Sequence, residues 1–182
     1  LQDVGVSVTA LDQTAIKNAG ILDISRLEFV TPGVTYGHIG TDSKIAIRGA
    51  NSNNTYRDNS SIAGAFIDGV YQTRAAQQRL GYFDVERMEI LKGPQGTLYG
   101  RNTIAGVINI KRTKPTGEFG LKLEGTFADH DRQDLKGVLN MPLGEKGGVK
   151  INWRDLEMDS HLYNETTKQR PYNRDSDVWS AA

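Results

Sequence analysis

The chain has 182 residues, carries 22 Lys and Arg against 22 Asp and Glu, and contains no cysteine. This length suits one large domain, or one domain with part of a second. The missing cysteines exclude disulfide frameworks, thiol catalysis and Cys-ligated metal sites, and the zero formal charge argues against a dedicated nucleic-acid binder. No run approaches the roughly 18 apolar residues of a membrane-spanning helix.

The first two-thirds of the chain alternate short strand-like runs with short helical ones. Valine alternates with small residues over 4–8, which predicts a half-buried strand. Asp12 is predicted to cap a helix that ends near Gly20. Asp23 is predicted to cap a second helix with its apolar residues on one face, and Pro32 stops it.

Further strands are predicted in this part of the chain, at 45–47, 65–67, 87–92 and 106–111. The dipeptide Asp68-Gly69 is a turn signal directly after the second of them. The first part of the chain is therefore predicted to be a small mixed α+β unit with many glycine turns.

The pattern changes near 113–117. Three runs then alternate apolar and charged residues with a period of two, and a polar stretch leads to a fourth run at Val178-Trp179. Runs of about ten residues are what a tilted transmembrane β-strand requires. The patterning alone is equally compatible with a soluble antiparallel sheet that packs one face on a core. Four such strands cannot close a barrel, so either sheet is incomplete. The three runs are 119–127, 135–143 and 149–153.

Charge and tryptophan content also separate the two parts. Residues 1–113 hold 12 Lys and Arg against 10 Asp and Glu, a net of +2, whereas residues 114–182 hold 10 against 12, a net of −2. Trp153 and Trp179 both lie in the second part, where a membrane-interface belt would place them.

The sequence offers no positive sign of catalysis. The glycine-rich stretch 93–106 has neither a Gly-Lys-Ser/Thr phosphate loop nor Gly-x-Gly-x-x-Gly spacing, and tight turns are the commoner use of such glycines. Neither a Gly-x-Ser-x-Gly elbow nor a His-Glu-x-x-His pattern occurs. Asp129-His130-Asp131 lacks the glycine and distal glutamate of a calcium loop, so a charged loop tip is the better interpretation. We therefore expect no enzyme activity, no cofactor and no metal site.

Five motifs occur in order along the first part of the chain. They are VGVSVTAL at 4–11, TPGV at 31–34, IAIRG at 45–49, FIDGVY at 66–71, and the segment 86–110 with its core EILKGPQGTLYG. In this order they resemble the plug domain of a TonB-dependent outer-membrane receptor. Residues 118–182 resemble the opening strands of the barrel that encloses such a plug.

The resemblance implies a fold and a location. The fold is an α+β plug domain over 1–114, a small mixed sheet with short helices, followed over 115–182 by the first antiparallel transmembrane strands of an incomplete β-barrel. The location is the bacterial outer membrane, with outer-membrane lipid and a periplasmic TonB-type energy-coupling protein as partners. The energy-coupling segment is expected before Leu1 and most of the barrel after Ala182.

The resemblance also implies a function. The receptor would import a scarce nutrient by ligand-gated, energy-coupled movement of the plug. A ferric siderophore is the default ligand, and cobalamin, haem or a glycan are alternatives. The rival hypotheses are a soluble α+β ligand-binding module without a membrane role and, more remotely, an enzyme that holds a phosphate with its glycine-rich segment.

Two sets of residues are expected to act in such a receptor. Plug loops supply ligand contacts, for which arginine and tyrosine suit an anionic, partly aromatic ligand. Plug charges beside the motifs are expected to lock the plug to the barrel wall. The alternatives are that the first set are exposed loop residues and the second are solvated strand ends. The ligand set is Tyr56, Arg57, Tyr71, Gln72, Arg74, Gln77 and Arg79, and the lock set is Arg48, Glu89, Lys92 and Arg101.

Overall fold

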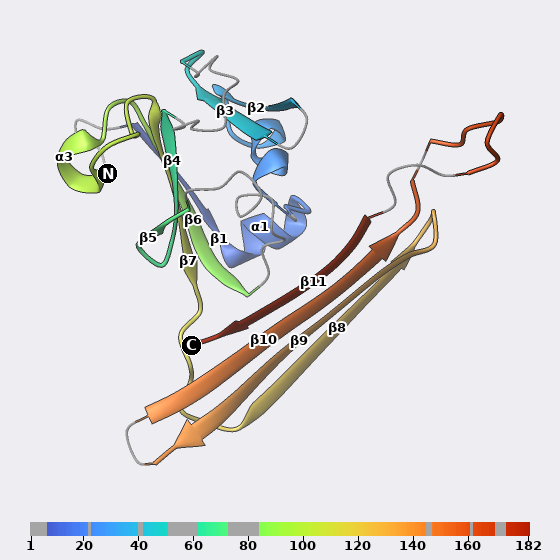
Figure 1. Ribbon diagram of the computed structural model, residues 1–182. Helices are drawn as coiled ribbons and strands as arrows, with labels where there is room; N and C mark the ends of the chain where they lie inside the picture. The colour runs from blue at the N-terminus through green and yellow to red at the C-terminus, as the bar shows by residue number, and fades with distance from the viewer. Residues whose placement is uncertain are drawn as a thin grey trace. The chain divides into compact units, whose positions relative to one another are not determined.

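The computed structural model describes residues 7–21, 23–39, 42–50, 62–72, 84–144, 147–160, 162–169 and 174–182. The chain divides into two compact units, Leu1–Thr113 and Lys114–Ala182, which are described separately (Figure 1). Within the described ranges, none of the helices is long and apolar enough to cross a membrane.

A mixed five-stranded sheet forms the body of the N-terminal unit, with strand order β1-β6-β7-β4-β5. Neighbouring strands are antiparallel except β4 and β7, which are parallel. Asp68 and Gly69 join β4 to β5 with φ angles of 50° and 84°, the two positive values of a type I′ hairpin turn, in which Asp-Gly is a preferred pair. The strands are β1 (Ser7–Asp12), β4 (Ala63–Ile67), β5 (Val70–Tyr71), β6 (Val85–Lys92) and β7 (Gly106–Arg112).

The two predicted helices are present, with one difference in type. The α1 helix (Gln13–Asn18) begins after Asp12, whose carboxylate accepts a hydrogen bond from the Ala15 amide at 2.7 Å. The second helix, η1 (Ile24–Phe29), is capped by Asp23 as predicted, but it is a 3-10 helix. Ile24 and Leu27 lie three positions apart, which is the period of a 3-10 helix, and share its buried face, whereas Phe29 is exposed.

Three more elements lie in the described part of the N-terminal unit. The strands β2 (Val34–Ile39) and β3 (Asp42–Ile47) pair antiparallel as a separate two-stranded sheet. The sequence had predicted a turn at the start of β2 and missed the strand. The short helix α3 (Gly96–Tyr99) lies in the glycine-rich stretch.

The core of the N-terminal unit lies on one face of the five-stranded sheet. Ile16 of α1, Leu27 of η1 and Ile47 of β3 are buried against sheet residues such as Ile90 and Ile108. Full burial of each such side chain is worth about 1.5–3 kcal/mol. The apolar cluster thus fixes one face of the sheet, and the other face carries most of its polar side chains.

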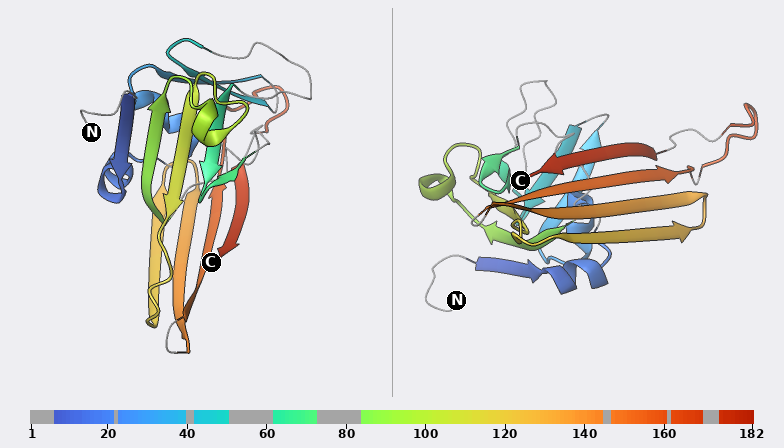
Figure 2. Two further views of the ribbon diagram at one scale, coloured as in Figure 1. Left: turned by 90° about the vertical axis from the view of Figure 1, so that its left-hand side faces the viewer. Right: turned by 90° about the horizontal axis from the view of Figure 1, so that it is seen from below.

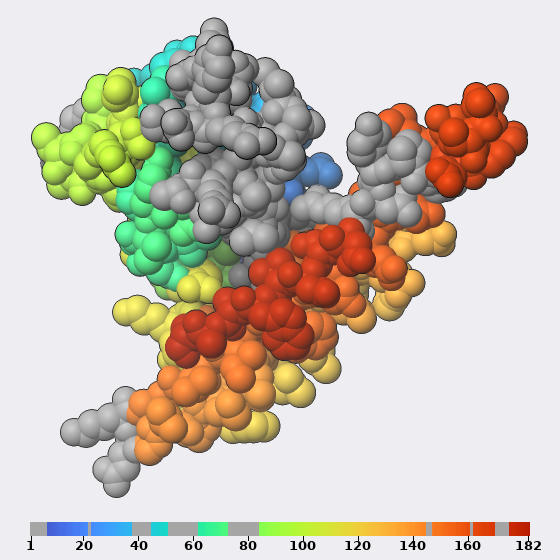
Figure 3. Space-filling view, viewed as in Figure 1, coloured from blue at the N-terminus to red at the C-terminus, as the bar shows by residue number. Residues whose placement is uncertain are grey.

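The C-terminal unit is a four-stranded antiparallel sheet in the order β11-β10-β9-β8 (Figures 1 and 2). All four predicted strands are present, and the fourth begins at Arg174, before the predicted Val178. In space-filling form the strands make one continuous layer, coloured yellow to dark red (Figure 3). Their bounds are β8 (Gly120–Ala128), β9 (Arg132–Leu143), β10 (Gly147–Met158) and β11 (Arg174–Ala181).

The register of these strands sorts their side chains onto two faces, because successive residues of a strand point to opposite sides. The apolar face carries Leu121, Leu123, Phe127, Leu135, Leu139, Met141, Leu143, Val149, Ile151, Trp153 and Trp179, and ends in Gln133, Asp155, Glu157, Asp175 and Asp177. The polar face carries Lys122, Glu124, Arg132, Asp134, Lys136, Lys150, Asn152 and Arg154, together with the apolar Val138, Leu156 and Val178.

In a soluble sheet the apolar side chains are buried and the charged ones are exposed, and here the reverse holds for several residues. On the apolar face Leu123 and Phe127 are 63% and 72% exposed, whereas on the polar face Asp134 and Arg154 are 0% and 2% exposed. A contiguous exposed apolar surface marks an interaction site for lipid or protein.

Candidate functional site

A polar and aromatic row crosses the sheet of the N-terminal unit on the face opposite its core. The register sets Glu89 of β6 beside Asn109 of β7, Asn109 beside Phe66 of β4, and Phe66 beside Tyr71 of β5. Asn109 Nδ2 donates to Glu89 Oε2 at 2.8 Å, and the rings of Phe66 and Tyr71 lie 5.3 Å apart. One row therefore holds a residue of the lock set and a residue of the ligand set.

Glu89 is held as a carboxylate by its neighbours. Arg87 Nε donates to Glu89 Oε1 at 2.7 Å. This hydrogen bond, supported by the one from Asn109, outweighs partial burial and holds the pKa of Glu89 below its usual value. Burial, with a smaller contribution from the Glu89 charge, raises the pKa of Tyr99, so the Tyr99 phenol keeps its proton at neutral pH.

The glycine-rich stretch places two side chains over this row. Tyr99, at the end of α3, meets the ring of Phe66 edge-on with centroids 5.0 Å apart. Asn102 Nδ2 donates to the Tyr71 hydroxyl at 3.3 Å. The chain turns between them at Gly100, which has φ +79°, a value that glycine adopts at no steric cost. These glycines therefore act as turn residues, which was the sequence-based interpretation.

Two residues of the lock set hydrogen-bond to the turn 31–33, one through its side chain and one through its backbone amide. Lys92 Nζ donates to the Pro32 carbonyl at 2.9 Å, and the Arg48 amide donates to the Gly33 carbonyl at 2.7 Å. Arg48 is exposed and has φ +54°, a conformation that residues other than glycine seldom adopt and that clusters at functional sites.

The lock set does not form a single cluster. Glu89 and Lys92 lie three positions apart in β6, so they point to opposite faces of the sheet. Arg101 is exposed in the bend after α3, next to Asn102. Within the ligand set, Gln72 Nε2 donates to the Val70 carbonyl at 2.9 Å. The other members, Tyr56, Arg57, Arg74, Gln77 and Arg79, lie outside the described residues.

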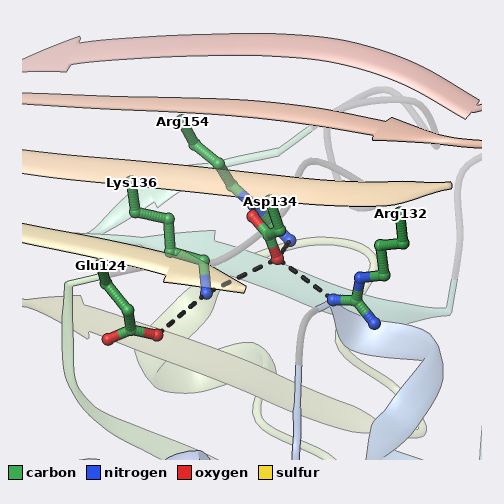
Figure 4. A network of polar contacts seen from close by, with 5 residues as sticks. All are labelled: Glu124, Arg132, Asp134, Lys136 and Arg154. Carbon is green, nitrogen blue, oxygen red and sulfur yellow. Dashed lines mark hydrogen bonds and ion pairs between the residues drawn. The ribbon is translucent and has the colours of Figure 1, made fainter. Parts of the chain in front are cut away.

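A charged network, which the sequence analysis did not single out, lies on the polar face of the C-terminal unit (Figure 4). Arg154 Nε and Nη2 donate to the two carboxylate oxygens of Asp134, both at 2.8 Å. Arg132 Nη2 donates to Asp134 at 3.1 Å. Lys136 Nζ lies 3.6 Å from Asp134 and 3.3 Å from Glu124. The one sequence feature that pointed toward this network was the alternation of charged with apolar residues along the strands.

The polar face carries a surplus of positive charge. Its described side chains include five cations and two carboxylates. Asp134 binds Arg154 in the bidentate geometry that makes ion pairs strong and specific. An arrangement of this kind can brace two strands and attract anions. In the described part of the chain, no group of three or more His, Asp or Glu side chains is placed to hold a metal ion.

Comparisons with known proteins match both units. Residues 1–107 match the family described as TonB-dependent Receptor Plug Domain. The chain is 32% identical over 142 residues to the pesticin receptor of Yersinia pestis, an alignment that covers 76% of this chain and 20% of that protein. It is 24% identical over 156 residues to the catecholate siderophore receptor Fiu of Escherichia coli K12, covering 82% and 19%.

Solved structures show the same likeness. The ferric yersiniabactin uptake receptor FyuA from Yersinia pestis superposes with a TM-score of 0.80 at 25% identity, over 97% of this chain and 28% of that chain. Pseudomonas aeruginosa FpvA, at 23% identity, shares the fold with a TM-score of 0.78, over 98% and 23%. The chain thus spans about a fifth of the length of the curated relatives it matches.

These matches extend over both units, so β8–β11 correspond to barrel strands that follow a plug, as predicted. The match to the plug family covers more than half of the chain. The chain belongs to the TonB-dependent receptor plug-domain family, whose members are receptors of the bacterial outer membrane.

Proposed function

We propose that the chain is the plug and first barrel strands of a receptor that imports a ferric siderophore across the outer membrane. Ligand binding from outside would free the energy-coupling segment for a TonB-type partner in the periplasm, and that partner would move the plug. Cobalamin, haem and glycans are the alternative ligands, and no catalytic step is invoked. The relatives quoted above that are named for ferric or siderophore ligands favour the iron chelate.

The observation that carries the proposal is the polarity of the C-terminal sheet. The large apolar side chains that the sheet exposes lie on its apolar face, and the charged side chains that it buries lie on its polar face, which is the arrangement of a barrel with lipid outside and a polar lumen inside. The surplus of cations on the polar face suits an anionic ligand, because a concave wall of one charge raises the local concentration of the opposite charge.

The ligand set and the lock set remain part of this proposal. Tyr71 offers a hydroxyl and a ring beside Asn102 and Phe66, and such a group can stack on and hydrogen-bond to an aromatic chelator. Arg48 and Lys92 are the cations that we expect to hold the plug against wall carboxylates. Glu89 is expected to pair with a wall cation in addition to Arg87.

The test is a growth-rescue and binding screen with the complete receptor in a host that lacks its own iron-chelate receptors. Catecholate, hydroxamate and mixed ferric siderophores would be compared with cobalamin, haem and oligosaccharides. Rescue by an iron chelate that requires the energy-coupling protein supports the proposal. Rescue by cobalamin, haem or a glycan alone would show that this compound, and not a ferric siderophore, is the ligand. Binding to none of these compounds would contradict the import function.

Two variants separate binding from plug retention. Tyr71→Phe keeps the ring and removes only the hydroxyl, so ligand affinity should fall while growth on saturating ligand persists. Arg48→Ala should loosen the plug and make the outer membrane permeable to large antibiotics, whereas Arg48→Lys should keep most of the retention. If Arg48→Ala leaves both plug retention and uptake unchanged, Arg48 is no lock residue.

A further inference from the structure

The apolar face of the C-terminal sheet ends in acidic residues, and the position of this boundary differs from strand to strand. On β10, Trp153 is followed on the same face by Asp155 and Glu157. On β11, Trp179 is preceded on that face by Asp177 and Asp175. The pairing sets Asp155 opposite Asp177 and Glu157 opposite Asp175. Carboxylates paired with carboxylates repel unless water screens them.

The register allows the boundary to be followed across all four strands. Four successive rows of the apolar face run from β8 through β9 and β10 to β11: Leu121-Leu139-Ile151-Ala181, Leu123-Gly137-Trp153-Trp179, Gly125-Leu135-Asp155-Asp177, and Phe127-Gln133-Glu157-Asp175. The last apolar residue before the boundary is Phe127 on β8, Leu135 on β9, Trp153 on β10 and Trp179 on β11. The boundary therefore recedes by two rows from β8 to β11.

The boundary therefore runs diagonally across the sheet, and its slope relative to the rows can be calculated. Along the strands the boundary shifts by two rows, which are four residues or about 14 Å at about 3.4 Å per residue. Across the sheet, β8 and β11 are three strand spacings of about 4.8 Å apart, which is also about 14 Å. A straight boundary with this slope makes an angle of about 45° with the rows. Strands of transmembrane barrels are tilted by about 35–45° from the membrane normal, so a flat membrane surface would cut them along such a diagonal.

The height of the apolar face agrees with this slope. On β9 it runs from Leu135 to Leu143, eight steps or about 27 Å along the strand. With a tilt of about 45° this is about 19 Å along the membrane normal between Cα atoms, and the end side chains extend it toward the band of about 25 Å that barrels present to lipid. Aromatic rings stand at its edge, since Trp153 and Trp179 pack with centroids 6.4 Å apart, as rings do at membrane interfaces.

We propose that the line Phe127-Leu135-Trp153-Trp179 is the outer edge of the hydrocarbon layer and that the strands cross it tilted by about 45°. This rests on the proposed function. The hydrocarbon of the outer membrane covers the apolar face below the line, and the four carboxylates beyond it stand in the aqueous headgroup layer. This end faces outward because it carries the long connection 159–173, whereas β9 and β10 are joined by three residues at the other end, and barrels have short periplasmic turns and longer external loops.

The test uses the complete receptor in liposomes, with single cysteines carrying nitroxide labels, in a background free of other cysteines. Phe127→Cys and Asp175→Cys lie in one row, yet the tilted boundary sets the first in hydrocarbon and the second in water. Collision with dissolved oxygen relative to a water-soluble nickel chelate should therefore be several-fold higher at position 127. Leu121→Cys and Ala181→Cys share a deeper row, and both should report hydrocarbon.

The possible outcomes separate this inference from the proposed function. Equal accessibility at 127 and 175, with 121 and 181 in hydrocarbon, would overturn the tilted boundary and leave the membrane barrel intact. Water at all four positions would overturn both. If Phe127→Cys does not insert, Leu135→Cys and Gln133→Cys test the same line on β9, where only the first should report hydrocarbon.

Discussion

Gly106 is a position where the backbone leaves no room for a side chain. It has φ +153°, and a Cβ there would meet the Leu91 carbonyl oxygen and lie 2.8 Å from Ile47 Cδ1. Because a backbone atom is the obstacle, Gly106→Ala should lower the stability of the β6–β7 pair by about 1–3 kcal/mol. Hydrogen exchange of the β6 and β7 amides in the folded receptor would measure it. Gly96→Ala, with nothing within 4 Å, is the matched control and should change exchange little.

Asp68 links the β4–β5 turn to β7. Its carboxylate accepts hydrogen bonds from the Arg112 amide at 2.9 Å and from Arg112 Nε at 2.6 Å. Partial burial acts to raise the pKa of Asp68, but these bonds outweigh it and lower the pKa below 3.8. A lowered pKa in the folded state means that the stabilisation is present above the unfolded pKa and is lost as the pH falls through the folded one.

Asp68→Asn tests this pH dependence, since asparagine tolerates the positive φ of the turn. The variant should lose about 1 kcal/mol or less at pH 7, because the pair is partly exposed. The difference from the parent in exchange of the Arg112 amide should shrink as the pH falls below 3.8. A difference that stays constant down to pH 2 would show that the carboxylate charge contributes nothing.

At the scale of single residues, the sequence predicted what depends on near neighbours. Asp12 and Asp23 cap helices through amides two or three residues away, and the positive φ angles of the Asp68-Gly69 turn are preferences of these two residues themselves. The bond between Glu89 and Asn109 joins residues 20 apart, and only the pairing of β6 with β7 brings them together. Sequence patterns do not encode that pairing locally, so this contact was missed.

At the scale of strands, the ring of Trp153 covers Gly137 on the neighbouring strand. A Cβ at Gly137 would lie 2.7 Å from Trp153 Cζ2, with other ring atoms nearer still. Gly137→Ala should therefore displace the ring and shift tryptophan fluorescence to the red, with a loss of about 1–3 kcal/mol. Gly125→Ala lies one row away on the same face, where the nearest atom is Leu135 Cδ2 at 3.4 Å. It should leave the fluorescence unchanged, and equal shifts in the two variants would contradict this account.

The pair Asp134–Arg154 braces β9 against β10. Removing one partner of a buried ion pair costs about 3–5 kcal/mol, because a charge is left buried without its counterpart, whereas removing both together costs much less. Asp134→Asn should therefore destabilise the refolded receptor strongly in urea titrations, more than Arg154→Met, which leaves Asp134 its contacts with Arg132 and Lys136. Combining Asp134→Asn with Arg154→Met should recover part of the loss. If the double variant is as unstable as the two single losses added, the pair contributes no coupling.

The sequence predicted strands well where alternation is regular and less well elsewhere. The runs that form β8, β9 and β10 each have an apolar side and a polar side, so their period of two was visible in the sequence. The segment of β2 starts directly after Thr31-Pro32-Gly33, and this turn signal hid the strand that begins at Val34. The second helix was misjudged in type, because an i, i+3 repeat fits a short α-helix as well as a 3-10 helix.

At the scale of the molecule, patterning alone could not decide between lipid and a protein core as the partner of the apolar face. The match to TonB-dependent receptors decides it, and the exposure of Leu123 and Phe127 on the apolar face agrees. The low overall hydrophobicity, 37% of the chain, agrees with a protein that crosses a membrane on alternate residues only. The neutral total charge likewise includes regions of opposite sign, since the polar face is positive and the strand ends are acidic.

Arginine substitutions on the apolar face test its contact with lipid at two depths. Leu123 lies two rows inside the edge that Phe127 marks on β8, whereas Gln133 lies just beyond the edge on β9. An arginine near the middle of the hydrocarbon costs about 2–4 kcal/mol and one near the interface about 0–1 kcal/mol. Leu123→Arg should therefore lower the free energy of folding into bilayers, measured by urea titration, several-fold more than Gln133→Arg. If the two arginines cost the same, the apolar face does not lie in a hydrocarbon layer of the depth inferred above.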